Sequence, residues 1–131
     1  MTFQITGAYA AILGLVAIFL SFHVIRLRAK SGVSLLDGGN TALKERIRRH
    51  GNFTEYVPLA LILMGLAEAG GASATWLHVI GGILVASRLI HPFGIKHDNA
   101  AAPARIIGAA GTQIAMLMAI GLIGWQHWGQ A

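Results

Sequence analysis

Several residue types and motifs are missing from this sequence, and their absence excludes whole classes of function. Cysteine does not occur in the 131 residues, so disulfides, thiolate metal sites and a cysteine nucleophile are excluded. The sequence contains no phosphate-binding loop, dinucleotide fingerprint or nucleophile elbow, and no two histidines have the i, i+4 spacing of a helical metal site. We therefore expect no bound metal.

Charge is also scarce, and what remains is strongly apolar. Only 11% of the residues are charged, against roughly 25% in soluble domains. Hydrophobic residues make up 55% of the chain and fall into four long runs whose lengths suit membrane helices. The expected fold class is all-α, an integral membrane four-helix bundle in which residues 1–131 form one domain. The sequence predicts helices at about 6–27, 41–67, 74–90 and 104–126.

The basic residues lie in the first and third loops and at the helix ends beside them, whereas the second loop and both termini have none. Because cytoplasmic loops carry an excess of Lys and Arg, we predict a multi-pass protein of the cell membrane. Both termini would lie outside, with the basic loops in the cytoplasm. The net charge of +5 is then explained by topology, and without interleaved aromatic residues it predicts no nucleic-acid partner.

Local signals add detail to the helices. Thr41 is expected to cap the second helix, and Pro58 should kink it near Thr54, whose hydroxyl could bond the freed carbonyl. Gln113 is expected to make an interhelical hydrogen bond. Small residues predict close helix contacts in the third and fourth helices, at Gly82, Ala86, Gly108, Gly111 and Ala115.

A polar face begins where the basic segment turns into the apolar part of the second helix. At 100° per residue, Asn52 lies about 40° and Glu55 about −20° from Arg48, so all three share a face that Tyr56 extends. Lipid cannot satisfy such groups. Two interpretations remain open: the face binds a ligand, or Arg48 and Glu55 only pair with each other.

The predicted topology brings several cations to the same boundary as this face. Arg28, Arg88, His91 and Arg105 would converge with it at the cytoplasmic ends of the helices. Guanidinium groups bind carboxylates in a fork and stay charged when desolvated, while a carboxylate such as Glu55 can hold an ammonium group. The set suits a zwitterionic ligand with more than one carboxylate. If the face is only structural, the remaining arginines would meet anionic lipid headgroups.

The second helix carries the motif Arg48-x-x-x-Asn52-x-x-Glu55-Tyr56-x-Pro58-Leu59. This motif, with Ser87–His91 ending the third helix and Arg105 opening the fourth, resembles the MAPEG family (membrane-associated proteins in eicosanoid and glutathione metabolism). That family includes microsomal glutathione transferases and leukotriene C4 synthase. The resemblance implies a homotrimer with glutathione bound between neighbouring subunits near the cytoplasmic boundary.

The resemblance also assigns roles to residues. The glutathione contacts of one subunit would be Arg48, Asn52, Glu55 and Tyr56, and those of its neighbour Arg28 and His50. His91 is also predicted to contact glutathione. Because His50 lies about 160° from Asn52 on the helix, it cannot share that subunit's site. Arg105 matches an arginine thought to stabilise the thiolate and is the predicted catalytic residue. His91 and Ile95 stand where eukaryotic members have tyrosines.

The leading hypothesis is a glutathione-dependent transferase or peroxidase that acts on lipophilic electrophiles from the bilayer, with glutathione as co-substrate. The short loops resemble bacterial members of the family, which implies the bacterial inner membrane. Two alternatives remain. The first is a non-catalytic trimeric scaffold or binding protein, suggested by His91 and Ile95. The second is a small four-helix exporter that uses Glu55, the one carboxylate placed for that role.

Overall fold

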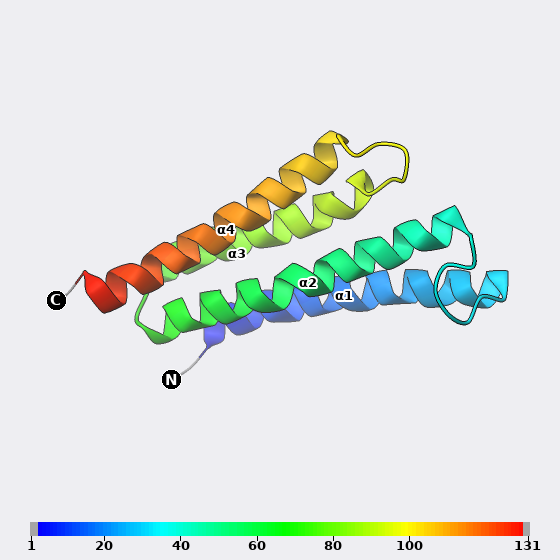
Figure 1. Ribbon diagram of the computed structural model, residues 1–131. Helices are drawn as coiled ribbons and strands as arrows, with labels where there is room; N and C mark the ends of the chain where they lie inside the picture. The colour runs from blue at the N-terminus through cyan, green and yellow to red at the C-terminus, as the bar shows by residue number, and fades with distance from the viewer. Residues whose placement is uncertain (1–2, 130–131) are drawn as a thin grey trace.

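The computed structural model describes residues 3–129 and contains four α-helices and one short 3₁₀ helix. Successive α-helices run antiparallel (Figure 1). The helices are α1 (Gln4–Ser31), α2 (Thr41–Ala69), α3 (Ala74–Ile90), η1 (His91–Gly94) and α4 (Pro103–Trp128). The 3₁₀ turn occupies the start of the segment 91–103, which the sequence predicted to be a loop throughout.

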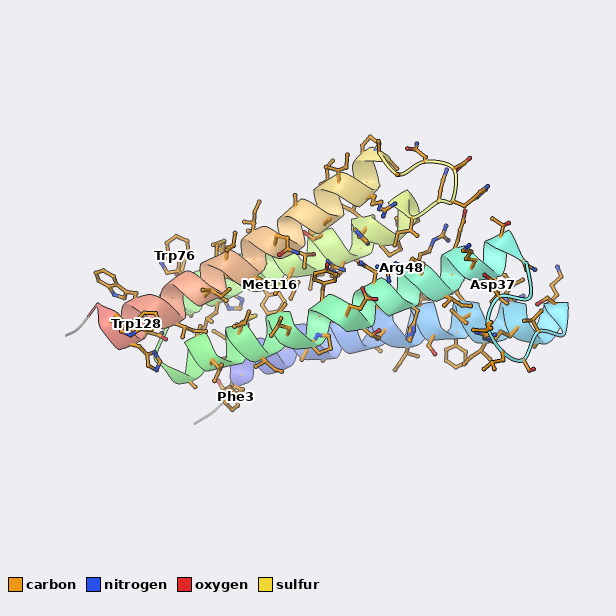
Figure 2. All side chains as sticks on the ribbon, viewed as in Figure 1. Phe3, Asp37, Arg48, Trp76, Met116 and Trp128 are labelled. Carbon is orange, nitrogen blue, oxygen red and sulfur yellow. The ribbon has the colours of Figure 1, made fainter. Side chains whose placement is uncertain are left out.

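The helices form two hairpins, α1 with α2 and α3 with α4 (Figure 1). The hairpins lie close together at the end that carries both termini, and they diverge toward the end that carries the α1–α2 and α3–α4 loops. The basic residues of the sequence belong to this open end. In Figure 2, Arg48 lies toward the open end, whereas Trp76 and Trp128 lie at the opposite end.

Capping residues set the ends of the helices. Gly32 closes α1 in the left-handed conformation with φ 67°, which suits a residue without a side chain. Asn40 caps α2 by accepting the N–H of Leu43 through its side chain. The prediction of Thr41 as the cap is therefore wrong by one residue, because Thr41 is already helical. Pro103 occupies the first turn of α4, where its missing N–H costs nothing.

The outer surface of the bundle is apolar, as the membrane interpretation requires. Three helical segments are long and apolar enough to cross a bilayer, namely α1, α3 with η1, and α4. Large hydrophobic side chains such as Leu15, Phe22 and Leu117 are exposed along them, and Ile62 is exposed on α2. Water would penalise this pattern, and lipid accepts it. The prediction of an all-α membrane bundle is confirmed. Because polar residues interrupt α2, its crossing stays a prediction.

Small residues of α4 allow the close packing that the sequence predicted. Gly108 lies against His91 and Gly111 against Ser87, while Ala115 is fully buried in the core. The prediction fails in α3, where Gly82 and Ala86 are exposed. There, the contact falls at Gly81, which packs against the ring of Tyr9. The face of α3 that meets α1 is therefore one residue away from the predicted one.

Two polar details also differ from the prediction. Gln113 is exposed and makes no side-chain hydrogen bond among residues 3–129; the neighbouring Thr112 bonds across helices instead. The Thr54 hydroxyl donates to the carbonyls of His50 and Gly51, so it does not satisfy the Thr54 carbonyl that Pro58 leaves without a donor.

At the end of the bundle opposite the basic loops, a carboxylate of α2 caps the start of α1. The Glu68 carboxylate accepts the N–H groups of Ile5 and Thr6 at 2.9 and 2.8 Å.

A matched pair of glycine substitutions tests the packing of α1 on α3. Gly81→Ala would place a methyl group in the Tyr9 ring, whereas Gly82→Ala would meet no atom within 4 Å. We expect Gly81→Ala to lower the free energy of unfolding by about 1–3 kcal/mol and Gly82→Ala to leave it unchanged or slightly raised. Thermal unfolding in detergent measures both. Equal stability of the two variants would contradict this packing.

Candidate anion-binding site at the open end of the bundle

A cavity of about 820 Å³ opens between α2, η1, the following loop and the start of α4. It lies at the end where the hairpins diverge. Six of the residues predicted from the sequence line it, from three separate segments of the chain: Arg48, Asn52, Glu55, Tyr56, His91 and Arg105. The described residues 3–129 contain no group of three metal-ligating His, Cys, Asp or Glu side chains.

Arg88 forms the polar centre of the packing beside this cavity. Its residue is only 2% exposed. Its Nε donates to Thr112 Oγ1 at 2.8 Å, with Nη2 donating to the same oxygen, and its Nη1 donates to Asn52 Oδ1 at 3.0 Å. The guanidinium also lies over the ring of Tyr56, 5.4 Å from the centroid. Arg88 thus joins α3 to both α4 and α2.

These bonds determine how the amide of Asn52 is presented. Because Asn52 Oδ1 already accepts from Arg88, its NH₂ group is the part that remains for a ligand. Thr112 supports the same arrangement, since its hydroxyl donates to the Gly108 carbonyl at 2.9 Å and keeps its lone pairs for Arg88. The site therefore offers a fixed donor from the middle of its polar face.

Arg48 and Glu55 form an ion pair at the mouth of the cavity. Arg48 Nη1 lies 2.7 Å from Glu55 Oε1, and the two side chains are 56% and 49% exposed. A pair this exposed contributes only about 0–1 kcal/mol. A ligand that carries both a carboxylate and an ammonium group can therefore separate the pair at little cost.

A second set of charges ties the α3–α4 loop to α2. Glu45, which precedes the apolar part of α2, accepts from Arg49 at 3.0 Å and from both the backbone N–H and ring Nδ1 of His97 at 2.9 Å. Arg49 also donates to the Ile95 carbonyl. The hydrogen bonds from His97, helped by the nearby charge of Arg49, hold the pKa of the Glu45 carboxyl below its usual value. Glu45 therefore stays ionised on the cavity wall.

Two predicted site residues do not reach the cavity of their own chain. Arg28 donates to the carbonyls of Val33 and Leu36 at 3.4 and 2.8 Å and so holds its own loop. His50 does not line the cavity either. The prediction that Arg28 converges with the Arg48 face is wrong within one chain, because Arg28 is bonded to its own loop. The assignment of Arg28 and His50 to the site of a neighbouring subunit stays a prediction.

The structure adds residues to which sequence reasoning gave no role. The sequence predicts no contact with the site for Thr112 or Glu45, and it predicts Arg88 at the boundary without a partner. An arginine inside an apolar helix was the available signal, since such a charge must find partners within the protein. His91 and Ile95 are both buried, so the cavity wall at the family's tyrosine positions is an imidazole and an aliphatic side chain.

The fold and the site together define an all-α membrane protein with a polar cavity that arginine and glutamate side chains line. The MAPEG family profile matches residues 6–125, and the chain belongs to the MAPEG family. It is similar to the inner membrane protein YecN of Escherichia coli strain K12, with 40% identity over 94 residues that cover 72% of each chain. YecN of Escherichia coli O6:H1 matches over the same length with the same identity.

Substitution of Thr112 tests the support of the buried arginine. Thr112→Val keeps the shape of the side chain but removes the acceptor of two Arg88 donors, so we expect a loss of about 2–3 kcal/mol in the free energy of unfolding. Thr112→Ser keeps the hydroxyl and should cost only about 1 kcal/mol for the lost methyl group. The measurement is thermal unfolding in detergent, and a serine variant no more stable than the valine variant would refute the role of the hydroxyl.

Proposed function

We propose that this chain binds glutathione in the cavity and acts as a glutathione-dependent transferase or peroxidase on lipophilic electrophiles. The observation that carries the proposal is that Arg48, Asn52, Glu55 and Tyr56 line one cavity together with Arg105. Glutathione has two carboxylates and one ammonium group, which match guanidinium donors, an amide and a carboxylate. Membership of a family that includes glutathione-dependent enzymes supports the same ligand.

Binding would proceed by exchange of partners at the ion pair. A glutathione carboxylate takes the place of Glu55 on Arg48, and the ammonium group takes the place of Arg48 on Glu55. Each charge keeps an opposite charge beside it, so little electrostatic energy is lost. Arg88 already donates to Asn52 Oδ1, so the Asn52 amide is oriented before the ligand binds. Its NH₂ group donates to the ligand without rearrangement, and such preorganisation favours affinity.

Arg105 would serve the chemical step. A guanidinium near the thiol lowers its pKa from about 8.5 and enriches the thiolate, which is the nucleophile. The thiol proton leaves to solvent, and in conjugation the sulfur forms a bond to the electrophilic carbon. Either a leaving group departs from that carbon with its electron pair, or the electron pair of an activated double bond moves to the neighbouring atom, which takes a proton from solvent. Arg105 lies at the start of α4, lines the cavity and is exposed, so its charge is free to face the sulfur.

The proposal includes a homotrimer in the membrane. Arg28 and His50 lie away from their own cavity, which is what contribution to a neighbour's site requires. Both YecN relatives are named as inner membrane proteins, and we infer the same location here, with the basic loops in the cytoplasm and both termini outside. Glutathione then arrives from the cytoplasm and the electrophile from the lipid.

A second candidate function is a non-catalytic binding protein of the same fold. It is favoured by the buried His91 and Ile95, which offer no phenol to the ligand at the family's tyrosine positions. Binding without turnover would distinguish it. The exporter hypothesis is disfavoured because Glu55, the carboxylate it needs, is paired with Arg48.

Calorimetric titration of glutathione into the detergent-purified protein tests the site. We expect wild type to bind, and Arg48→Ala and Glu55→Gln each to weaken binding by about 2 kcal/mol, roughly thirtyfold, because each loses a charged contact. Lys30→Ala is the matched control, since Lys30 is a basic residue that is exposed at the end of α1 and does not line the cavity. It should bind as wild type does.

Two results would contradict the proposal. If wild type binds neither glutathione nor a related thiol, Arg48 and Glu55 are only a structural pair. If Lys30→Ala weakens binding as much as Arg48→Ala does, the attraction is a general effect of positive charge and not a site.

A further inference from the structure

A second, smaller cavity lies between α1, the start of α2 and the α3–η1 junction, apart from the glutathione site. Its volume is about 250 Å³. Its walls are mainly apolar, and no acidic side chain lines it among the described residues: Val16, Phe19, Leu20, His23, Arg46, Arg49, Arg88, Leu89, Pro92 and Phe93. The proposed function uses none of the α1 residues in this groove.

The groove opens onto the apolar outer surface of the bundle. Phe19, Leu89 and Phe93 are 60%, 49% and 76% exposed, and α1 and α3 with η1 are membrane-spanning candidates. Its volume is below the roughly 300–1,000 Å³ of a pocket that encloses a whole small molecule. The shape therefore suits part of an extended apolar chain that continues into the bilayer.

Three arginines line the groove, and they differ in how many of their N–H donors already have partners. Arg88 is bonded to Thr112 and Asn52, and Arg49 is paired with Glu45. Arg46 makes one bond, from Nη1 to the His23 carbonyl at 3.0 Å, and its other N–H groups have no partner among residues 3–129. Arg46 is thus the arginine of the groove whose N–H groups remain available to bind a ligand.

We propose that this groove binds an anionic phospholipid. One acyl chain lies against Phe19, Leu20 and Leu89, and the phosphate accepts hydrogen bonds from Arg46. The charge complementarity selects an anionic headgroup, since three arginines and no carboxylate line the space. Basic pockets between membrane helices hold anionic headgroups in this manner. The inference is independent of glutathione binding.

Native mass spectrometry of the full chain tests the proposal. Protein purified with extensive detergent washing is mixed with equal amounts of dioleoyl phosphatidylglycerol and dioleoyl phosphatidylcholine. Wild type should retain phosphatidylglycerol preferentially, and Arg46→Gln should reduce that retention about fivefold, the effect of one arginine near a lipid headgroup. Arg26→Gln is the matched control, because Arg26 is exposed on α1 and does not line the groove; it should retain the lipid as wild type does.

A second variant, Val16→Phe, fills the groove without changing charge and should abolish the preferential retention. Equal retention of both lipids by wild type would overturn the proposal, as would an equal loss in Arg26→Gln and Arg46→Gln. If Val16→Phe instead changes the oligomeric mass and leaves lipid retention intact, the groove is covered by a second copy of the chain and the proposal fails.

Discussion

The burial of the Arg88 guanidinium is the constraint on which the arrangement of the open end depends. A charged group inside an apolar bundle is costly by several kcal/mol unless its donors are satisfied. Arg88 meets this requirement with an acceptor from α4 and another from α2, and with the ring of Tyr56. A movement of one hairpin relative to the other would break the contacts of Arg88 with Asn52 and Tyr56, which join α3 to α2. The same bonds that satisfy the charge therefore hold Asn52 and Tyr56 in the positions from which they face the cavity.

The charges around the cavity divide into those that are fixed and those that are exchangeable. Arg88, Glu45 and Arg49 are held by bonds to other segments of the chain. Glu45 lines the cavity, and the two arginines fix the packing beside it. Arg48 and Glu55 are half-exposed and pair weakly, and Arg105 is exposed. A zwitterionic ligand can displace the second group without disturbing the first. In the proposed function, this separation allows reversible binding of a charged ligand beside the apolar core.

The sequence predicted the parts of the structure that depend on local spacing. Long apolar runs located the helices, and the 100° step placed Arg48, Asn52 and Glu55 on one face, which the structure brings into one cavity. Features that depend on the angle between helices were missed. No local signal distinguishes Gly81 from Gly82, because only the position of Tyr9 on α1 decides which one is in contact. The role of Glu68 has no local signal either, since it depends on the start of α1 lying beside it. The partners of Arg88 are 24 and 36 residues away in the sequence.

The measurement that tests the glutathione site most directly is a structure of the protein in lipid nanodiscs with glutathione, determined by electron cryomicroscopy. We expect a glutathione carboxylate on Arg48 in place of Glu55, the ammonium group on Glu55, and the Arg88–Asn52 bond unchanged. Arg28 of a neighbouring subunit should have left its own loop to reach the ligand. An unbroken Arg48–Glu55 pair beside a cavity without glutathione would contradict the proposed site. Arg28 still bonded to the Leu36 carbonyl, with glutathione present, would contradict a site shared between neighbouring subunits.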